Sequence, residues 1–417
     1  MADKRDITIK RRAAAKPKSK PAPAEEKQSS SPAKRKRKKK NILRLALRML
    51  LVVAALALVV VLIYNWKSLA PEAMVEWIET VFTGRGNGDG FPLSIDGESV
   101  LDMTQVKRQT ALLADHSLVF LSDSAGEFRR CSYSFTNPIM STADKYVLLL
   151  DRGGTQYQLE TRFETVCAGA LSGGSILTGC IDEEGTFAVA MQASSQDYLS
   201  TVVLMDRTGK QIFLWKSPKW MVTDVALRDG RLAVSGICAS EGALSSAVIL
   251  FDYLNDPNNP VIRQQGDTMF SRIFLSEQQT VSVVTDQAVQ CYDFNGNLRG
   301  RFDFGGLEWT AAAQCGDMLG IVLSSSGFPD GGYVVVLDDS ASPTLRTDFQ
   351  GAFRSLKSKA DGFWLLTDLS VYPVTKTALQ QGIAVPADSR LACDFNGSPL
   401  VLGLSELQHY LQGDDDQ

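Results

Sequence analysis

Beyond residue 90 the chain alternates short apolar segments with polar turns, and one apolar pattern recurs along its length. The copies, ALLAD, VLLLD, AVAMQ, AVSGI, SVVTD, GIVLS, WLLTD and VLGLS, begin at residues 111, 147, 188, 233, 282, 320, 364 and 401. Successive copies are 36 to 49 residues apart. A repeat of about 40 to 45 residues is typical of the four-stranded blades of a β-propeller.

Turn motifs around these copies support the same architecture. DEEG at 182–185, DRTG at 206–209 and DFNG at 293–296 each end a β-rich run and precede another. Glycine adopts positive φ readily, and the Asp side chain hydrogen-bonds nearby backbone amides, so these residues are explained as turn residues. The pattern of each unit is therefore four strands joined by three turns.

Eight copies predict an all-β propeller of eight blades at residues 91–412, with seven blades open if one copy is a false match. The last unit has room for only three strands. The segment FPLSI at 91–95 stands alone before the first unit. We expect it to supply the missing outer strand of the last blade, because that closes the ring and leaves no open edge between the first and last blades.

The N-terminal region has a different pattern. Residues 49–66 contain no charged side chain, and the longer stretch 42–66 contains only Arg44 and Arg48. About 20 apolar residues suffice to span a bilayer as a helix, and arginines near a helix end can extend to the headgroups. Tyr64 and Trp66 occupy the expected position of an interfacial aromatic belt. This pattern predicts a transmembrane signal-anchor helix at 42–66.

Two alternatives explain this apolar stretch less well. A buried core helix would need protein on every side, yet a polar segment precedes it. A cleaved signal peptide would have a basic region of more than 40 residues, and Pro71 directly follows the small-residue pair Ser68 and Ala70.

Charge is divided sharply along the chain. Residues 1–48 carry 18 basic and four acidic side chains, whereas the remainder carries 25 basic and 43 acidic ones. The acidic part would be repelled by nucleic acid. Basic residues beside a span remain in the cytoplasm, so they predict a cytoplasmic N-terminus, an extracytoplasmic C-terminal domain and contact with anionic headgroups. The predicted topology residues are Lys34, Arg35, Lys36, Arg37, Lys38, Lys39, Lys40, Arg44 and Arg48.

Three short segments complete the predicted organisation. Residues 1–40 have almost no apolar side chains and are expected to be a disordered basic tail. Residues 67–90 combine a short amphipathic helix, PEAMVEWIETVF, with the glycine-rich linker GRGNGDG, which lacks the spacing of a phosphate loop. Residues 413–417 form an acidic tail.

The blade segments resemble an uncharacterised bacterial family. The resemblance covers residues 91–410 and lies in segments such as FPLSIDGESVLDM, ALLADHSLVFL, NPIMSTADKYVLLLDRGG, VTDVALRDGRLAV and IFLSEQQTVSVVTD. It implies a single N-terminal anchor helix and an extracytoplasmic quinoprotein-like propeller. The family has no established activity, so the resemblance implies no functional residues.

No catalytic, cofactor-binding or metal-binding residues are predicted. The two histidines, His116 and His409, belong to no metal-ligand or catalytic motif. A calcium site needs six to eight convergent oxygens, and we interpret the aspartates at 123, 151, 206, 293, 338 and 339 as turn residues. The seven cysteines show no CxxC spacing and are expected to be small buried side chains, with one or two disulfides as the alternative. We expect the tryptophans at 215, 220, 309 and 364 to pack between blades.

Three functional classes remain open at this point. The leading hypothesis is a membrane-tethered interaction or scaffold module with a protein partner in the cell envelope, which predicts an exposed apolar patch on one propeller face. The second is a small-molecule or glycan sensor that uses the central channel. The third, a quinone-dependent oxidoreductase, rests on fold analogy alone and predicts polar and acidic residues beside an aromatic stacking face in the channel.

Overall fold

The computed structural model describes residues 88–411, apart from 96, 98, 241 and 326–329, together with Met49. Two compact units divide at residues 78 and 79, and the propeller lies in the second. The described part contains no helix long and apolar enough to cross a membrane. The predicted cytoplasmic tail, the predicted span apart from Met49, the predicted short helix and the acidic tail lie outside the described residues.

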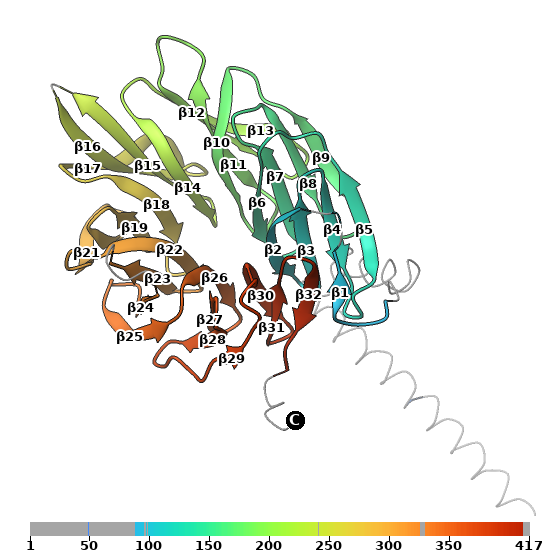
Figure 1. The fold of residues 1–417 in the computed structure, drawn as a ribbon. Helices are drawn as coiled ribbons and strands as arrows, with labels where there is room; N and C mark the ends of the chain where they lie inside the picture. The colour runs from blue at the N-terminus through green and yellow to red at the C-terminus, as the bar shows by residue number, and fades with distance from the viewer. Residues whose placement is uncertain are drawn as a thin grey trace, which may run out of the picture. The chain divides into compact units, whose positions relative to one another are not determined.

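In the described part of the chain, thirty-two strands form eight antiparallel sheets of four strands, as the sequence predicts, and the sheets follow one another around a ring (Figure 1). Blades are numbered 1 to 8 from the sheet β2–β5 onward. The first strands are β2 (Val100–Val106), β6 (Pro138–Ala143), β10 (Gly174–Ile181), β14 (Met221–Arg228), β18 (Phe270–Leu275), β22 (Glu308–Cys315), β26 (Phe353–Lys359) and β30 (Leu391–Phe395). First strands of successive blades contact each other in seven of the eight neighbouring pairs, all except β18 and β22, so these strands surround the axis of the ring.

Each of the eight copies of the repeated apolar segment begins in a second strand, and VLGLS continues into the turn after it. They are β3 (Gln109–Ala114), β7 (Tyr146–Asp151), β11 (Phe187–Ala193), β15 (Arg231–Ser240), β19 (Val281–Thr285), β23 (Met318–Ser324), β27 (Gly362–Thr367) and β31 (Ser398–Leu402). Several of them are buried along their whole length, because neighbouring strands flank them and adjacent blades cover both faces. Burial on both faces explains why they appear in the sequence as continuous apolar runs.

The third and fourth strands complete each blade. The third strands are β4 (Ser117–Leu121), β8 (Gln156–Glu160), β12 (Ser200–Met205), β16 (Ala243–Asp252), β20 (Ala288–Tyr292), β24 (Gly331–Leu337), β28 (Ser370–Thr375) and β32 (Glu406–His409). The fourth, outer strands are β5 (Glu127–Ser132), β9 (Thr165–Ala170), β13 (Gln211–Ser217), β17 (Asp256–Gly266), β21 (Leu298–Asp303), β25 (Pro343–Gln350), β29 (Ile383–Ala384) and β1 (Leu93–Ser94).

The last blade confirms the predicted closure. Its sheet has the order β1-β32-β31-β30, and Leu93 and Ser94 pair with Leu407 and Glu406. The outer strand of blade 8 therefore comes from the start of the propeller sequence. An apolar cluster that includes Leu407, Phe395 and Met103 then joins blade 8 to blade 1.

The core is divided into eight apolar clusters, one at each interface between neighbouring blades. The four tryptophans lie in these clusters, as predicted: Trp215 and Trp220 between blades 3 and 4, Trp309 between blades 5 and 6, and Trp364 between blades 7 and 8. Trp364 also donates a hydrogen bond to Asp394 at 2.9 Å. All seven cysteines are free, and burial is the main cause of the raised thiol pKa at six of them, Cys131, Cys167, Cys180, Cys291, Cys315 and Cys393.

Turn chemistry explains the aspartates that follow β-rich runs. Asp206 accepts hydrogen bonds from the backbone N–H groups of Thr208 and Lys210, and Asp338 accepts from those of Ser340 and Ser342. Asp293 accepts in the same way from Asn297. In the described part of the chain, no group of three or more His, Cys, Asp and Glu side chains could hold a metal ion.

We expect Leu407→Ala to destabilise the propeller by about 2 to 5 kcal/mol, because it leaves a cavity between the closing strand and blade 1. Leu407 is fully buried, whereas Leu404 in the preceding turn is 66% exposed and provides a matched control. Leu404→Ala should change the free energy of unfolding by no more than about 0.5 kcal/mol. Chemical denaturation measures both values, and equal effects would contradict the closure described here.

Candidate functional site

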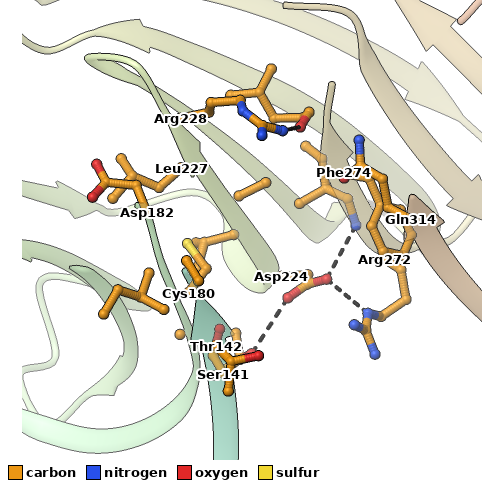
Figure 2. A pocket seen from close by; sticks show the side chains of 18 of the residues that line it. Ser141, Thr142, Cys180, Asp182, Asp224, Leu227, Arg228, Arg272, Phe274 and Gln314 are labelled. Atoms are coloured by element: carbon orange, nitrogen blue, oxygen red, sulfur yellow. Dashed lines mark hydrogen bonds and ion pairs between the residues drawn. The ribbon is translucent and has the colours of Figure 1, made fainter. Parts of the chain in front are cut away.

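A cavity of about 1080 Å³ lies among the first strands at the centre of the ring. Side chains of β6, β10, β14 and β18 line most of it, and Gln314 of β22 lines one side (Figure 2). Its wall is mixed, with hydroxyl groups, aliphatic side chains, Phe274 and charged residues. Polar and charged groups contribute more of this lining than apolar ones do, so the cavity suits a polar ligand.

The first strands share an irregularity that shapes this wall. In six of them the pairing with the second strand shifts by one residue at the same level, leaving Leu101, Leu177, Thr223, Ser271, Thr310 and Arg354 as the extra residues. A β-bulge of this kind twists the strand and redirects the side chains beside it. The residues that follow the bulges in blades 3, 4 and 5 are Thr178, Asp224 and Arg272.

These three residues meet in the cavity wall although each comes from a different blade. Asp224 Oδ2 accepts hydrogen bonds from Arg272 Nε at 2.9 Å and from the backbone N–H of Ile273 at 3.2 Å (Figure 2). Thr178 Oγ1 lies 3.4 Å from Asp224 Oδ1. Asp224 is therefore the polar link between blades 3, 4 and 5.

Asp224 and Arg272 differ strongly in their exposure. Asp224 is 7% exposed, and burial raises the pKa of its carboxyl group, while the Arg272 guanidinium and the Ile273 N–H act in the opposite direction. The Arg272 side chain remains 53% exposed and lies 5.6 Å from the centre of the Phe274 ring. Among the described residues, the hydrogen bond of the Arg272 side chain is made through Nε, and its Nη1 and Nη2 groups donate none.

The cavity mouth at the ends of the first strands is acidic. Arg228 Nη2 lies 3.4 Å from a carboxylate oxygen of Glu183 and 3.5 Å from one of Glu277, which joins the turns of blades 3, 4 and 5. Three more carboxylates line the same end, those of Asp182, Glu184 and Asp229. Negative charge is thus concentrated at one end of the cavity, away from Arg272.

The two faces of the ring have different surfaces. We call the face where the first strands begin the start face, and the opposite one the end face. Seven of the eight turns from first to second strand carry charged residues, and these turns lie on the end face. Exposed large apolar side chains lie at strand beginnings and turns of the start face: Leu101, Leu199, Met221, Leu244, Met269, Leu369 and Leu404.

The site residues predicted from the sequence lie outside the described residues. They are Lys34, Arg35, Lys36, Arg37, Lys38, Lys39, Lys40, Arg44, Arg48, Tyr64 and Trp66. His116 is exposed in the turn between β3 and β4, and His409 packs beside Phe91 and Phe395. No tryptophan lines the cavity, whose aromatic side chain is Phe274.

Asp224 and Arg272 were missed by reasoning from sequence. Their signal is a charged residue inside an otherwise apolar strand, in MVTDVALR and FSRIFL. A buried charge needs a partner, so both positions could have been marked as partners of unknown residues. Pairing them required the structure.

The family of the chain follows from its blade sequence. A model described as a family of unknown function, DUF5711, matches residues 101–380. The chain belongs to this family. The DUF5711 match covers most of the described propeller and assigns no activity, and no curated protein matches the chain in sequence.

Several solved structures are similar to this chain at low sequence identity. BamB from Moraxella catarrhalis is 13% identical, with a TM-score of 0.42 over 64% of this chain and 79% of that one. Apo AztD from Citrobacter koseri is 8% identical, with a TM-score of 0.46 over 74% and 89%. Hsv2 from Kluyveromyces lactis is 10% identical, with a TM-score of 0.46 over 70% and 100%.

Asp182 gives the mouth a testable pH dependence. Burial raises the pKa of Asp182 from 3.8 to about 6. Hydrogen bonds from the N–H groups of Thr186 and Glu184 lower this pKa but do not cancel the effect of burial. The folded state therefore holds this proton up to a higher pH than the unfolded state does, so its contribution to stability falls as pH rises from about 4 to about 6. Asp182→Asn keeps an oxygen that can accept the same hydrogen bonds but does not titrate.

The measurement is the difference in the free energy of unfolding between wild type and Asp182→Asn, taken at several pH values. We expect the wild type to lose stability relative to the variant between about pH 4 and pH 6, and the difference to be constant above that range. A difference that is independent of pH from 3 to 7 would contradict the raised pKa.

Proposed function

We propose that this chain is a membrane-anchored extracytoplasmic binding protein that recognises a protein partner of the cell envelope through the start face of its propeller. The observation that carries the proposal is the gathering of exposed apolar side chains on that face. Apolar groups that remain exposed together are characteristic of interaction surfaces. The end face carries fewer of them, among them Leu254 and Leu298, and seven of its eight turns from first to second strand are charged.

Blade 4 and its neighbours carry the core of the proposed surface. Met221 begins β14 and Leu244 lies near the start of β16, so both belong to blade 4. Leu199 and Met269 lie at the same face on blades 3 and 5. Leu199 is joined to β13 by the hydrogen bond from its N–H to the Ser217 carbonyl, and Leu244 accepts one from the N–H of Asp267. These backbone contacts fix the positions of Leu199 and Leu244 at the start face.

The entry point of the chain supports this choice of face. The N–H groups of Gly88 and Gly90 donate hydrogen bonds to Ser124, in the turn between β4 and β5, which lies on the end face. The described residues therefore begin at the end face, on the side opposite the proposed partner surface.

The proposed surface predicts the outcome of a crosslinking experiment on intact membranes. Met221→Glu or Leu244→Glu should weaken partner binding by about tenfold or more, because a charge would be buried against an apolar contact. Leu254→Glu is the matched control, since Leu254 is 68% exposed at the opposite end of the same blade.

The readout is quantitative photo-crosslinking of the full chain through a probe at position 269, followed by mass spectrometry. A partner should be enriched with wild type and Leu254→Glu and lost with both start-face variants. Crosslinks that survive both variants would overturn the proposed surface.

The proposed topology rests on the basic cluster Lys34–Lys40. Replacement of all seven residues by Gln should produce a fraction of molecules with inverted orientation, because the charge bias that retains the tail in the cytoplasm is weakened. Protease added to intact cells measures which domain is accessible. If protease still reaches only the propeller, the cluster is not needed and Arg44 with Arg48 suffices.

A further inference from the structure

We infer that the central cavity binds a short zwitterionic peptide in an extended conformation, with its terminal carboxylate on Arg272 and its amino group at the acidic mouth. This site is separate from the proposed partner surface, since it lies inside the ring between blades 2 and 6. Three observations support the inference. The orientation of Arg272 supports the carboxylate, the distribution of charge supports the amino group, and the exposed strand edges support the extended conformation.

Arg272 is held in the orientation that a carboxylate ligand requires. Asp224 fixes its Nε at 2.9 Å, and Phe274 lies beneath the guanidinium. The Nη1 and Nη2 groups have no partner among the described residues and border the cavity. A guanidinium fixed at Nε presents its remaining N–H donors as a planar fork, a geometry that matches the two oxygens of a carboxylate.

The charge of the whole cavity excludes a simple anion as the preferred ligand. Three arginines line it, Arg152, Arg228 and Arg272, against six acidic residues, Asp182, Glu183, Glu184, Asp224, Asp229 and Glu277. A free anion would meet a net negative potential. Arg228 is shared between Glu183 and Glu277, so the mouth keeps a net negative charge. A ligand with one negative and one positive group could therefore bind Arg272 with the first and the mouth with the second.

The separation of the charges sets the length of the ligand. Arg272 lies three residues before the end of β18, where the acidic mouth begins. At about 3.3 Å per strand residue this corresponds to about 10 Å. An extended chain covers at most about 3.3 to 3.6 Å per residue, so a peptide of about four residues, about 13 to 14 Å long, reaches from Arg272 into the mouth.

The cavity wall offers the backbone partners that such a peptide needs. Each first strand is the inner edge of its sheet, so part of its N–H and C=O groups are not used within the blade. Hydroxyl groups of Ser141, Thr142, Thr223 and Ser271 add further donors and acceptors. Pairing of an extended peptide with an exposed strand edge is an established recognition mode.

Titration calorimetry tests the inference on the full chain in detergent micelles, with tetra-alanine as the probe. We expect saturable binding of tetra-alanine. C-terminal amidation or N-terminal acetylation should each weaken binding by about tenfold or more, because each removes one charged hydrogen-bonding end. No saturable binding of tetra-alanine at millimolar concentration would overturn the inference.

Variants identify the residue involved. Arg272→Lys keeps a positive charge beside Asp224 but removes the fork, and it should weaken tetra-alanine binding by about tenfold while leaving the melting temperature nearly unchanged. In Arg272→Gln, amidation of the peptide should have no further effect. Arg346→Lys is the matched control, since Arg346 lies on β25 over Tyr333, away from the cavity.

Two further outcomes would contradict the assignment. Equal affinity for acetate, inorganic phosphate and tetra-alanine would show an anion site rather than a peptide site. Undiminished binding by Arg272→Lys and Arg272→Gln would place the peptide elsewhere. Met221→Glu and Leu244→Glu should bind tetra-alanine as the wild type does, so this test and that of the partner surface can fail independently.

Discussion

Packing between neighbouring blades is the interaction on which the rest of the structure depends. No four-stranded sheet of this chain can cover its own two apolar faces, and each of the eight apolar clusters therefore combines side chains from two successive blades. The arrangement is complete only when blade 8 meets blade 1. The pairing of β1 with β32 joins the beginning of the propeller sequence to its end, so closure unites segments more than 300 residues apart.

Closure of the ring also determines where chemistry is possible. Because the sheets radiate from one axis, the first strands surround a space that no single blade contains. Bulges at one level of six first strands turn the following side chains, and in three consecutive blades this brings Thr178, Asp224 and Arg272 together. Asp224 is buried and fully engaged, whereas Arg272 keeps donors in the cavity. The β-bulges of the first strands thereby fix the orientation of the Arg272 guanidinium.

Much of the fold could be predicted from sequence because its signals are local. The repeated apolar segment marks the second strand of every blade, the strand that is buried on both faces. Asp206, Asp293 and Asp338 lie in turns whose hydrogen bonds span only two to four residues, so their role is visible in the sequence. The closing strand was predictable because FPLSI stood alone and the last unit lacked one strand.

The candidate site was not predictable in the same way. Asp224 and Arg272 are 48 residues apart, and each appears in the sequence as a single charge within an apolar strand. The apolar start face was also not predictable. Leu199, Met221, Leu244 and Met269 are isolated apolar residues in the sequence, and only the folding of blades 3, 4 and 5 places them on one face. The sequence by itself determined the repeat, the turns and the strand that closes the ring, and it favoured eight blades over seven, because these depend on local periodicity and chain length. Only the tertiary structure decided which charges meet in the cavity and which face is apolar, because both depend on the register of strands in different blades.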